Sequence, residues 1–111
     1  MPIEWDDFEQ VDMRVGKIVR VEDFPDSRNP SYWMTVDFGP EIGVKHSSAA
    51  IREIYHKDEL VGRQVVAVVN FPPKQIAHHL SEVLVLAAVN SDGSMRLLGP
   101  DAEVQLGSRI A

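Results

Sequence analysis

The chain of 111 residues contains no cysteine. This absence excludes disulfide bonds, a cysteine nucleophile and thiolate ligands for zinc. Long hydrophobic segments are also missing, because the longest unbroken apolar run, VLVLAAV at 83–89, has seven residues, whereas a membrane-spanning helix needs about 20. The first twelve residues carry five acids and no base, which is unlike a secretory signal peptide. These absences predict a cytoplasmic protein that does not insert into a membrane.

Basic residues are in short supply. Lysine and arginine together number 11 against 17 acids, which gives a net charge of −6. Proteins that bind nucleic acids without sequence preference usually carry a basic excess, because neutralising phosphates supplies their affinity. This chain is therefore expected to bind RNA only if its few bases gather on one face.

The motifs of common catalytic and metal sites are missing as well. There is no glycine-rich phosphate loop and no G-x-S-x-G nucleophile motif. The four histidines do not have the spacing of known metal ligands, and neighbouring histidines on one loop tend to point apart; they are His46, His56, His78 and His79. The sequence predicts a protein that is not an enzyme, with no metal site and no cofactor.

What the chain does have is a series of short segments with alternating apolar residues, as expected for strands. The expected strands are 13–24, 32–39, 42–48, 63–70 and 82–90. Between the third and fourth, Ile51, Ile54 and Tyr55 have helical spacing, and Ser47 or Ser48 is suited to cap a helix there. The order predicts an all-β fold, a five-stranded OB-fold barrel with one helix between strands 3 and 4. The length fits one domain over 1–111.

Short extensions flank the predicted barrel. Residues 4–11 are expected to form a short amphipathic helix or turn with Trp5 and Phe8 on one side. Near the other end, NSDGS at 90–94 is typical of a hairpin turn. The segments MRLLG at 95–99 and EVQLG at 103–107 are expected to be short strands.

The strand patterns contain two details that affect the surface. Gly16 lies inside the first strand, where a glycine often marks a bulge, and a bulge there would turn Lys17 outward. Val19 and, in the third strand, Val44 are expected to face inward. The fourth and fifth strands are apolar on both faces, which favours cover by a second subunit.

The connector NFPPKQIAHHLSE at 70–82 joins these two most hydrophobic segments. Exposed apolar groups near a sheet edge suit the docking of extended polypeptide. The candidate peptide-binding residues are Trp33, Phe71, Pro72, Ile76 and Leu80. The alternative is that these side chains fill a subunit interface.

RNA is the other ligand class that the residues suggest, because OB barrels bind it with a basic groove and aromatic platforms. The candidates are Arg14, Arg20, Arg28, Trp33, Lys45 and Lys74. The alternative is that these are ordinary surface charges, with Trp33 covering the barrel.

Three long segments carry a resemblance to a known family. FEQVDMRVGKIVRVEDFP at 8–25 resembles the opening of the tRNA-binding domain family. DFGPEIGVKHSSAAI at 37–51 and VVAVVNFPPKQIAHHLSEVLVLAAV at 65–89 are similar to its CsaA group of export-related chaperones. The resemblance implies an OB-fold homodimer that binds unfolded polypeptides or preproteins and assists protein export, with the secretion machinery as a further partner.

The same resemblance implies tRNA as an alternative ligand. The loop of the tRNA binders is matched here by Asn70, Pro73, Lys74 and Ser81, whereas Gln75 and Ala77 stand where bases are common. Together with the bases that could cluster on one face, the candidate tRNA-binding residues are Arg14, Arg28, Lys45, Asn70, Lys74 and Ser81. A third interpretation is an accessory subunit of a synthetase or another complex.

Overall fold

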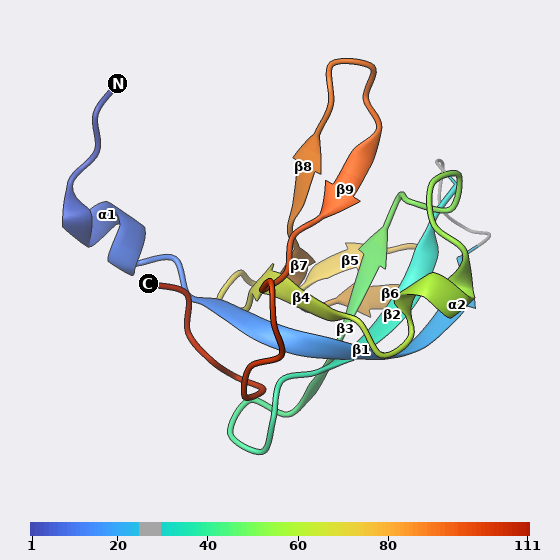
Figure 1. Cartoon of the computed structure of the whole chain (residues 1–111), viewed down its shortest axis with the longest axis horizontal. Coiled ribbons are helices and arrows are strands. Elements are labelled where there is room, and N and C mark those ends of the chain that lie inside the picture. The colour runs from blue at the N-terminus through green and yellow to red at the C-terminus, as the bar shows by residue number, and fades with distance from the viewer. Residues whose placement is uncertain (25–29) are drawn as a thin grey trace.

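A five-stranded antiparallel sheet curls into a barrel in the computed structural model of the chain (Figure 1). The structure describes residues 1–24 and 30–111. Along the sheet the strands are β3 (Val44–Ala49), β2 (Tyr32–Asp37), β1 (Met13–Asp23), β4 (Gln64–Val68) and β7 (Leu84–Val85). The sheet nearly closes just before β7, where the backbone N–H of Glu82 donates to the carbonyl of His46 at 2.8 Å. The predicted OB-fold barrel is confirmed.

The barrel interior is filled by alternating residues of the strands. Ile18, Met34, Val36 and Val65 have no exposed surface, as the period of two in a half-buried strand requires. Leu60 of the short helix α2 (Lys57–Leu60) is equally buried and packs with this cluster. The helix therefore has the predicted position between the third and fourth strands and contributes to the core.

The predicted start of this helix was wrong. Ser47 and Ser48 lie in β3, paired with Met34 and Trp33, and cap nothing. The chain then makes a single turn in which the N–H of Tyr55 donates to the carbonyl of Ile51 at 3.0 Å. The helical spacing still identified core residues, because Ile51 and Tyr55 are both buried.

The bulge in β1 lies later than predicted. Gly16 pairs regularly with Val65, and the register shifts between Ile18 and Arg20. The extra residue, Val19, is 45% exposed instead of facing inward. Gly16 is needed for another reason: a Cβ there would lie 2.6 Å from Cγ1 of Val36, closer than real Cβ contacts come.

Replacing Gly16 with alanine is expected to lower the free energy of unfolding by roughly 2–3 kcal/mol, because the added methyl group overpacks the core. Urea unfolding followed by circular dichroism measures the change. Gly62→Ala is the matched control, since a Cβ there would meet no atom within 4 Å. Its loss of stability comes only from the left-handed backbone, with a φ of +91°, and should be about 1 kcal/mol. Equal losses in the two variants would contradict the crowding at Gly16.

The rest of the sheet structure lies in two small hairpins. Strands β5 (Lys74–Ile76) and β6 (His79–Ser81) form one inside the connector, which was predicted without strands. The predicted fifth strand divides, since β8 (Ala87–Val89) leaves the barrel and pairs with β9 (Met95–Leu97) in a hairpin that projects from it (Figure 1).

Two further strand predictions were wrong. Val44 is 52% exposed at the start of β3 and does not face inward. Residues 103–107 form no strand; the side chain of Gln64 holds this segment by donating to the carbonyl of Val104 at 2.7 Å and accepting from its N–H at 3.0 Å. Hydrogen bonds from a side chain thus replace the backbone hydrogen bonds expected between paired strands.

The predicted N-terminal helix is present as α1 (Trp5–Glu9), which lies apart from the barrel (Figure 1). None of its residues is buried, and Trp5 is 83% exposed. No helix among the described residues is long and apolar enough to cross a bilayer.

Candidate functional site

The β5–β6 hairpin lies against the barrel through His79. Its ring contacts the rings of Phe24 and Trp33 edge-on, with centroids 4.9 and 4.8 Å apart. Because neighbouring strand residues point to opposite faces, Leu80 points away from this contact and is 52% exposed. Ile76 pairs with His79 and is half-buried.

Trp33, expected as an exposed docking residue, is only 9% exposed. His79 covers one side, and His46 stacks on its ring with an interplanar angle of 7° and a centroid distance of 5.8 Å. Trp33 therefore supports the rings above it and offers little surface of its own to a ligand.

An apolar hollow of about 280 Å³ lies where the connector meets β7. Its walls include Phe71 and Leu84, which are 53% and 48% exposed. The lining, called the connector hollow below, is Phe71, Pro72, Lys74, Ser81, Glu82, Val83 and Leu84. Two of the five predicted peptide-binding residues, Phe71 and Pro72, line it, whereas Trp33, Ile76 and Leu80 do not.

Glu82 holds one rim of the connector hollow in place. Its carboxylate Oε1 accepts from the backbone N–H of His46 at 3.0 Å and contacts the ring Nδ1 of the same residue at 3.1 Å. Lys45 Nζ lies 4.0 Å from Oε2. The carboxylate is therefore engaged with β3, and Lys45 is drawn to the same rim.

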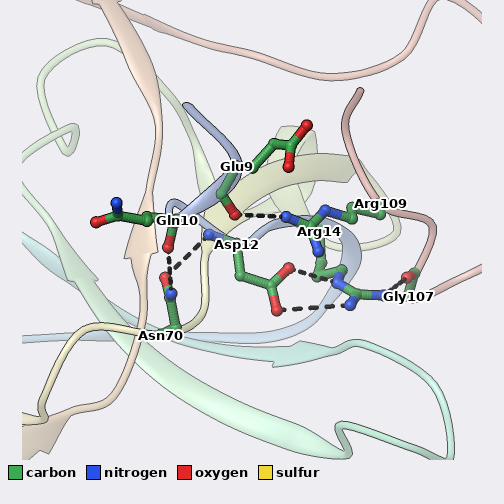
Figure 2. Close-up of polar contacts among 7 residues, drawn as sticks. All are labelled: Glu9, Gln10, Asp12, Arg14, Asn70, Gly107 and Arg109. Carbon is green, nitrogen blue, oxygen red and sulfur yellow. Dashed lines mark hydrogen bonds and ion pairs between the residues drawn. The ribbon is translucent and has the colours of Figure 1, made fainter. Parts of the chain in front are cut away.

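Two of the predicted RNA-binding residues have structural partners (Figure 2). Asn70 donates from Nδ2 to the carbonyl of Gln10 at 2.7 Å and accepts from the N–H of Asp12 at 3.0 Å. Arg14 pairs with Asp12 at 2.7 Å and donates to the carbonyl of Gly107 at 3.0 Å. Hydrogen bonding to Asp12 raises the pKa of Arg14 above its ordinary value. Both side chains thus tie segments of the chain together.

The remaining predicted RNA-binding residues lie nearer the connector hollow. Lys74 and Ser81 line it, and Lys45 is at its rim. Ser81 Oγ also accepts from the N–H of Ser48 at 3.4 Å. Arg28 lies outside the described residues. Of the wider candidates, Arg20 is exposed and paired with Glu22 at 3.1 Å.

The contacts of Asn70 join α1 to the start of the connector, and Arg109 adds a third link by donating to the carbonyl of Glu9 at 2.8 Å (Figure 2). Asn70→Ala is expected to lower the free energy of unfolding by about 1 kcal/mol, because two exposed hydrogen bonds are lost. It should also speed hydrogen exchange in α1, measured by mass spectrometry. Asn90→Ala, which removes a hydrogen bond to Ser94 in the distant hairpin turn, should leave α1 unchanged. Unchanged α1 exchange in Asn70→Ala would contradict this link.

Nothing in residues 1–24 and 30–111 brings three histidine or acidic side chains together as metal ligands require. Among the lining residues, Glu82, Val83 and Leu84 were not expected to belong to the site. Their position next to Ser81, a predicted site residue, was the one indication in the sequence. It was not enough, because the hollow forms only in the folded connector.

A family model described as a putative tRNA binding domain matches residues 13–109. The chain belongs to this family. Within it, two solved chaperones are similar over their full length: CsaA from Bacillus anthracis, with 42% identity, a TM-score of 0.94 and coverage of 100% of both chains, and CsaA from Picrophilus torridus, with 49% identity, a TM-score of 0.92 and coverage of 99% and 100%.

A longer relative is similar to nearly the whole chain. The methionine–tRNA ligase of Thermococcus onnurineus is 40% identical over 108 residues, which are 97% of this chain but 14% of that enzyme. The chain therefore spans about one seventh of the length of this relative. The predicted resemblance to the CsaA group of the tRNA-binding domain family is confirmed.

Proposed function

We propose that the protein is a CsaA-like molecular chaperone without catalytic activity, which holds unfolded polypeptides or preproteins and assists their export. The connector hollow is the observation that carries this proposal, because half-exposed Phe71 and Leu84 offer apolar surface beside a rigid sheet. Exposed apolar surface of this kind marks interaction sites. The full-length similarity to two CsaA structures supports the same role.

The lining suggests how a client segment binds. An extended polypeptide inserts one large apolar side chain between Phe71 and Leu84, and the transfer of that side chain from water supplies the affinity. Lys74 has no carboxylate within 4.0 Å in the described part of the chain, so its ammonium group favours clients with an acid near the apolar residue. A folded protein has buried such side chains and is not held.

A second copy of the chain completes the proposed chaperone. The apolar side chains of Met1, Ile3 and Trp5 are exposed on and before α1, and a small domain gains stability by burying further surface in an oligomer. A symmetric dimer buries this surface twice and presents two connector hollows to one client.

Titration with a permanently unfolded polypeptide, followed by fluorescence anisotropy, tests the proposal. We expect saturable binding that changes little between low and physiological salt, because apolar contacts are not screened. Suppression of aggregation of a heated client gives an independent readout. Absence of both activities from a dimeric preparation would contradict the chaperone role.

tRNA binding is the second candidate function. It is favoured by Lys45 and Lys74 at one hollow, beside the stacked rings of Trp33 and His46, and by the family model. Binding of labelled bulk tRNA is expected to weaken steeply as salt rises, since each neutralised phosphate releases counterions. Anisotropy at low and physiological salt measures this, and salt-independent binding would contradict a phosphate-based contact.

A further inference from the structure

Three of the basic side chains without a carboxylate partner gather in one place. Among residues 1–24 and 30–111, five lysines and arginines have a carboxylate oxygen within 4.0 Å; they are Arg14, Arg20, Lys45, Arg52 and Lys57. Two others lie elsewhere: Arg109 donates to the carbonyl of Glu9 in α1, and Lys74 lines the connector hollow. The three that remain are Lys17, Arg96 and Arg63, which also donates to the carbonyl of Glu59 at 3.3 Å. In a chain with a net charge of −6, three neighbouring bases without an ion pair are unexpected.

Lys17 and Arg63 line a second hollow, of about 470 Å³, which faces the chain at 97–103. Lys17 is half-buried in β1. Removing an ammonium group from water without a partner costs free energy. A bound anion in this hollow would offset that cost.

Arg63 and Arg96 meet at the ring of Tyr55. Their guanidinium carbons lie 5.1 and 5.6 Å from the ring centroid, so they are separated by no more than the sum of these distances. The ring is held firmly, because Tyr55 is 4% exposed and its hydroxyl accepts from the N–H of Leu97 at 3.1 Å. Two like charges from separate segments of the chain thus contact one aromatic ring, although they repel each other.

We propose that Lys17, Arg63 and Arg96 form an RNA-binding surface that holds phosphate groups of the RNA backbone. This basic surface consists of residues different from Lys45 and Lys74 at the connector hollow. The proposal takes the identity of the ligand from the second candidate function, tRNA binding, and rests on it. The guanidinium group of arginine can donate two hydrogen bonds to the oxygens of one phosphate group. Two such groups suit an RNA strand, whose phosphate charges repeat along its backbone.

Two acids of the chain lie at the same hollow. Asp101 and Glu103 line it together with Lys17 and Arg63, yet neither forms an ion pair with any of the three bases. The charges of the three bases therefore remain available to a ligand, and the two carboxylates oppose the approach of an anion.

The test is fluorescence anisotropy with labelled bulk tRNA at several salt concentrations. Arg63→Gln with Arg96→Gln is expected to weaken binding at low salt by roughly tenfold and to make the slope of log affinity against log salt shallower by about 2. The matched control, Arg52→Gln with Lys57→Gln, removes the same charge from two bases that are paired with Asp23. It should weaken binding by less than about twofold.

A second change should act in the opposite direction. Asp101→Asn with Glu103→Gln removes repulsion at the same hollow and is expected to tighten tRNA binding by roughly threefold. Lys17→Gln serves as a further variant if the double arginine change prevents folding, which thermal unfolding reveals. Poly-glutamate at equal charge should displace tRNA poorly.

The remaining outcomes would overturn the proposal. Equal losses in the control pair would mean that diffuse charge, not this basic surface, binds RNA. Loss confined to Lys45→Gln with Lys74→Gln would leave tRNA binding standing and remove this surface alone. No binding by the unmodified protein at low salt would remove both, and efficient displacement by poly-glutamate would make the ligand an acidic polypeptide.

Discussion

The double change Phe71→Ser with Leu84→Ser is expected to weaken binding of an unfolded polypeptide about thirtyfold. Both side chains are half-exposed walls of the connector hollow. Each would contribute roughly 1 kcal/mol by burying its exposed apolar surface against a client, and about 2 kcal/mol together corresponds to this change in affinity. Anisotropy titration with a permanently unfolded polypeptide measures it.

The effect should be specific to the connector hollow. Val44→Ser with Val61→Ser is the matched control, because both valines are 52% exposed and neither lines the hollow. Leu80→Ser examines the outer face of the β5–β6 hairpin separately. Dissociation of the proposed dimer by Phe71→Ser with Leu84→Ser would identify the hollow as a subunit interface and contradict its role as a client site.

Trp5→Ser is expected to weaken dimer formation by roughly a thousandfold. Trp5 is 83% exposed on α1, and burying a large aromatic side chain is worth about 2–3 kcal/mol. Because a symmetric interface buries each residue twice, the two copies together account for at least 4 kcal/mol, or about three orders of magnitude. Sedimentation velocity over a range of concentrations measures the dissociation constant.

The helix itself should survive this substitution, since α1 is tied to the barrel by Asn70 and Arg109. Circular dichroism and thermal unfolding provide that check, and Val61→Ser is a control on another exposed apolar residue. An unchanged dissociation constant in Trp5→Ser, or a monomeric unmodified protein, would contradict the dimer proposed here.

The barrel was predictable because its strands follow a simple period. Val36 is fully buried between the partly exposed Thr35 and Asp37, and Met34, two residues earlier, is fully buried as well. The same period could not place Ser47 and Ser48, which were predicted to cap a helix. Small polar residues suit both a helix cap and an edge strand. Their pairing with β2 decides between the two, and that pairing joins residues far apart in the sequence.

The candidate site was predictable only in part. The sequence drew attention to the connector but did not predict its hairpin. The turn contains Ala77 at a φ of +53°, where glycine or asparagine is the usual residue and would have indicated a turn. Glu82, which lines the connector hollow, reaches its partner His46 across 36 residues, and local sequence patterns do not predict a contact of that range. The basic surface around Tyr55 likewise joins Arg63 and Arg96 from separate elements.

Isothermal titration calorimetry with one client, presented unfolded and folded, tests the chaperone role most directly. Saturable binding of the unfolded form, with a negative heat-capacity change from apolar burial, and no binding of the folded form would support a connector hollow that holds unfolded chains. Equal binding of both forms, or binding of neither, would contradict it.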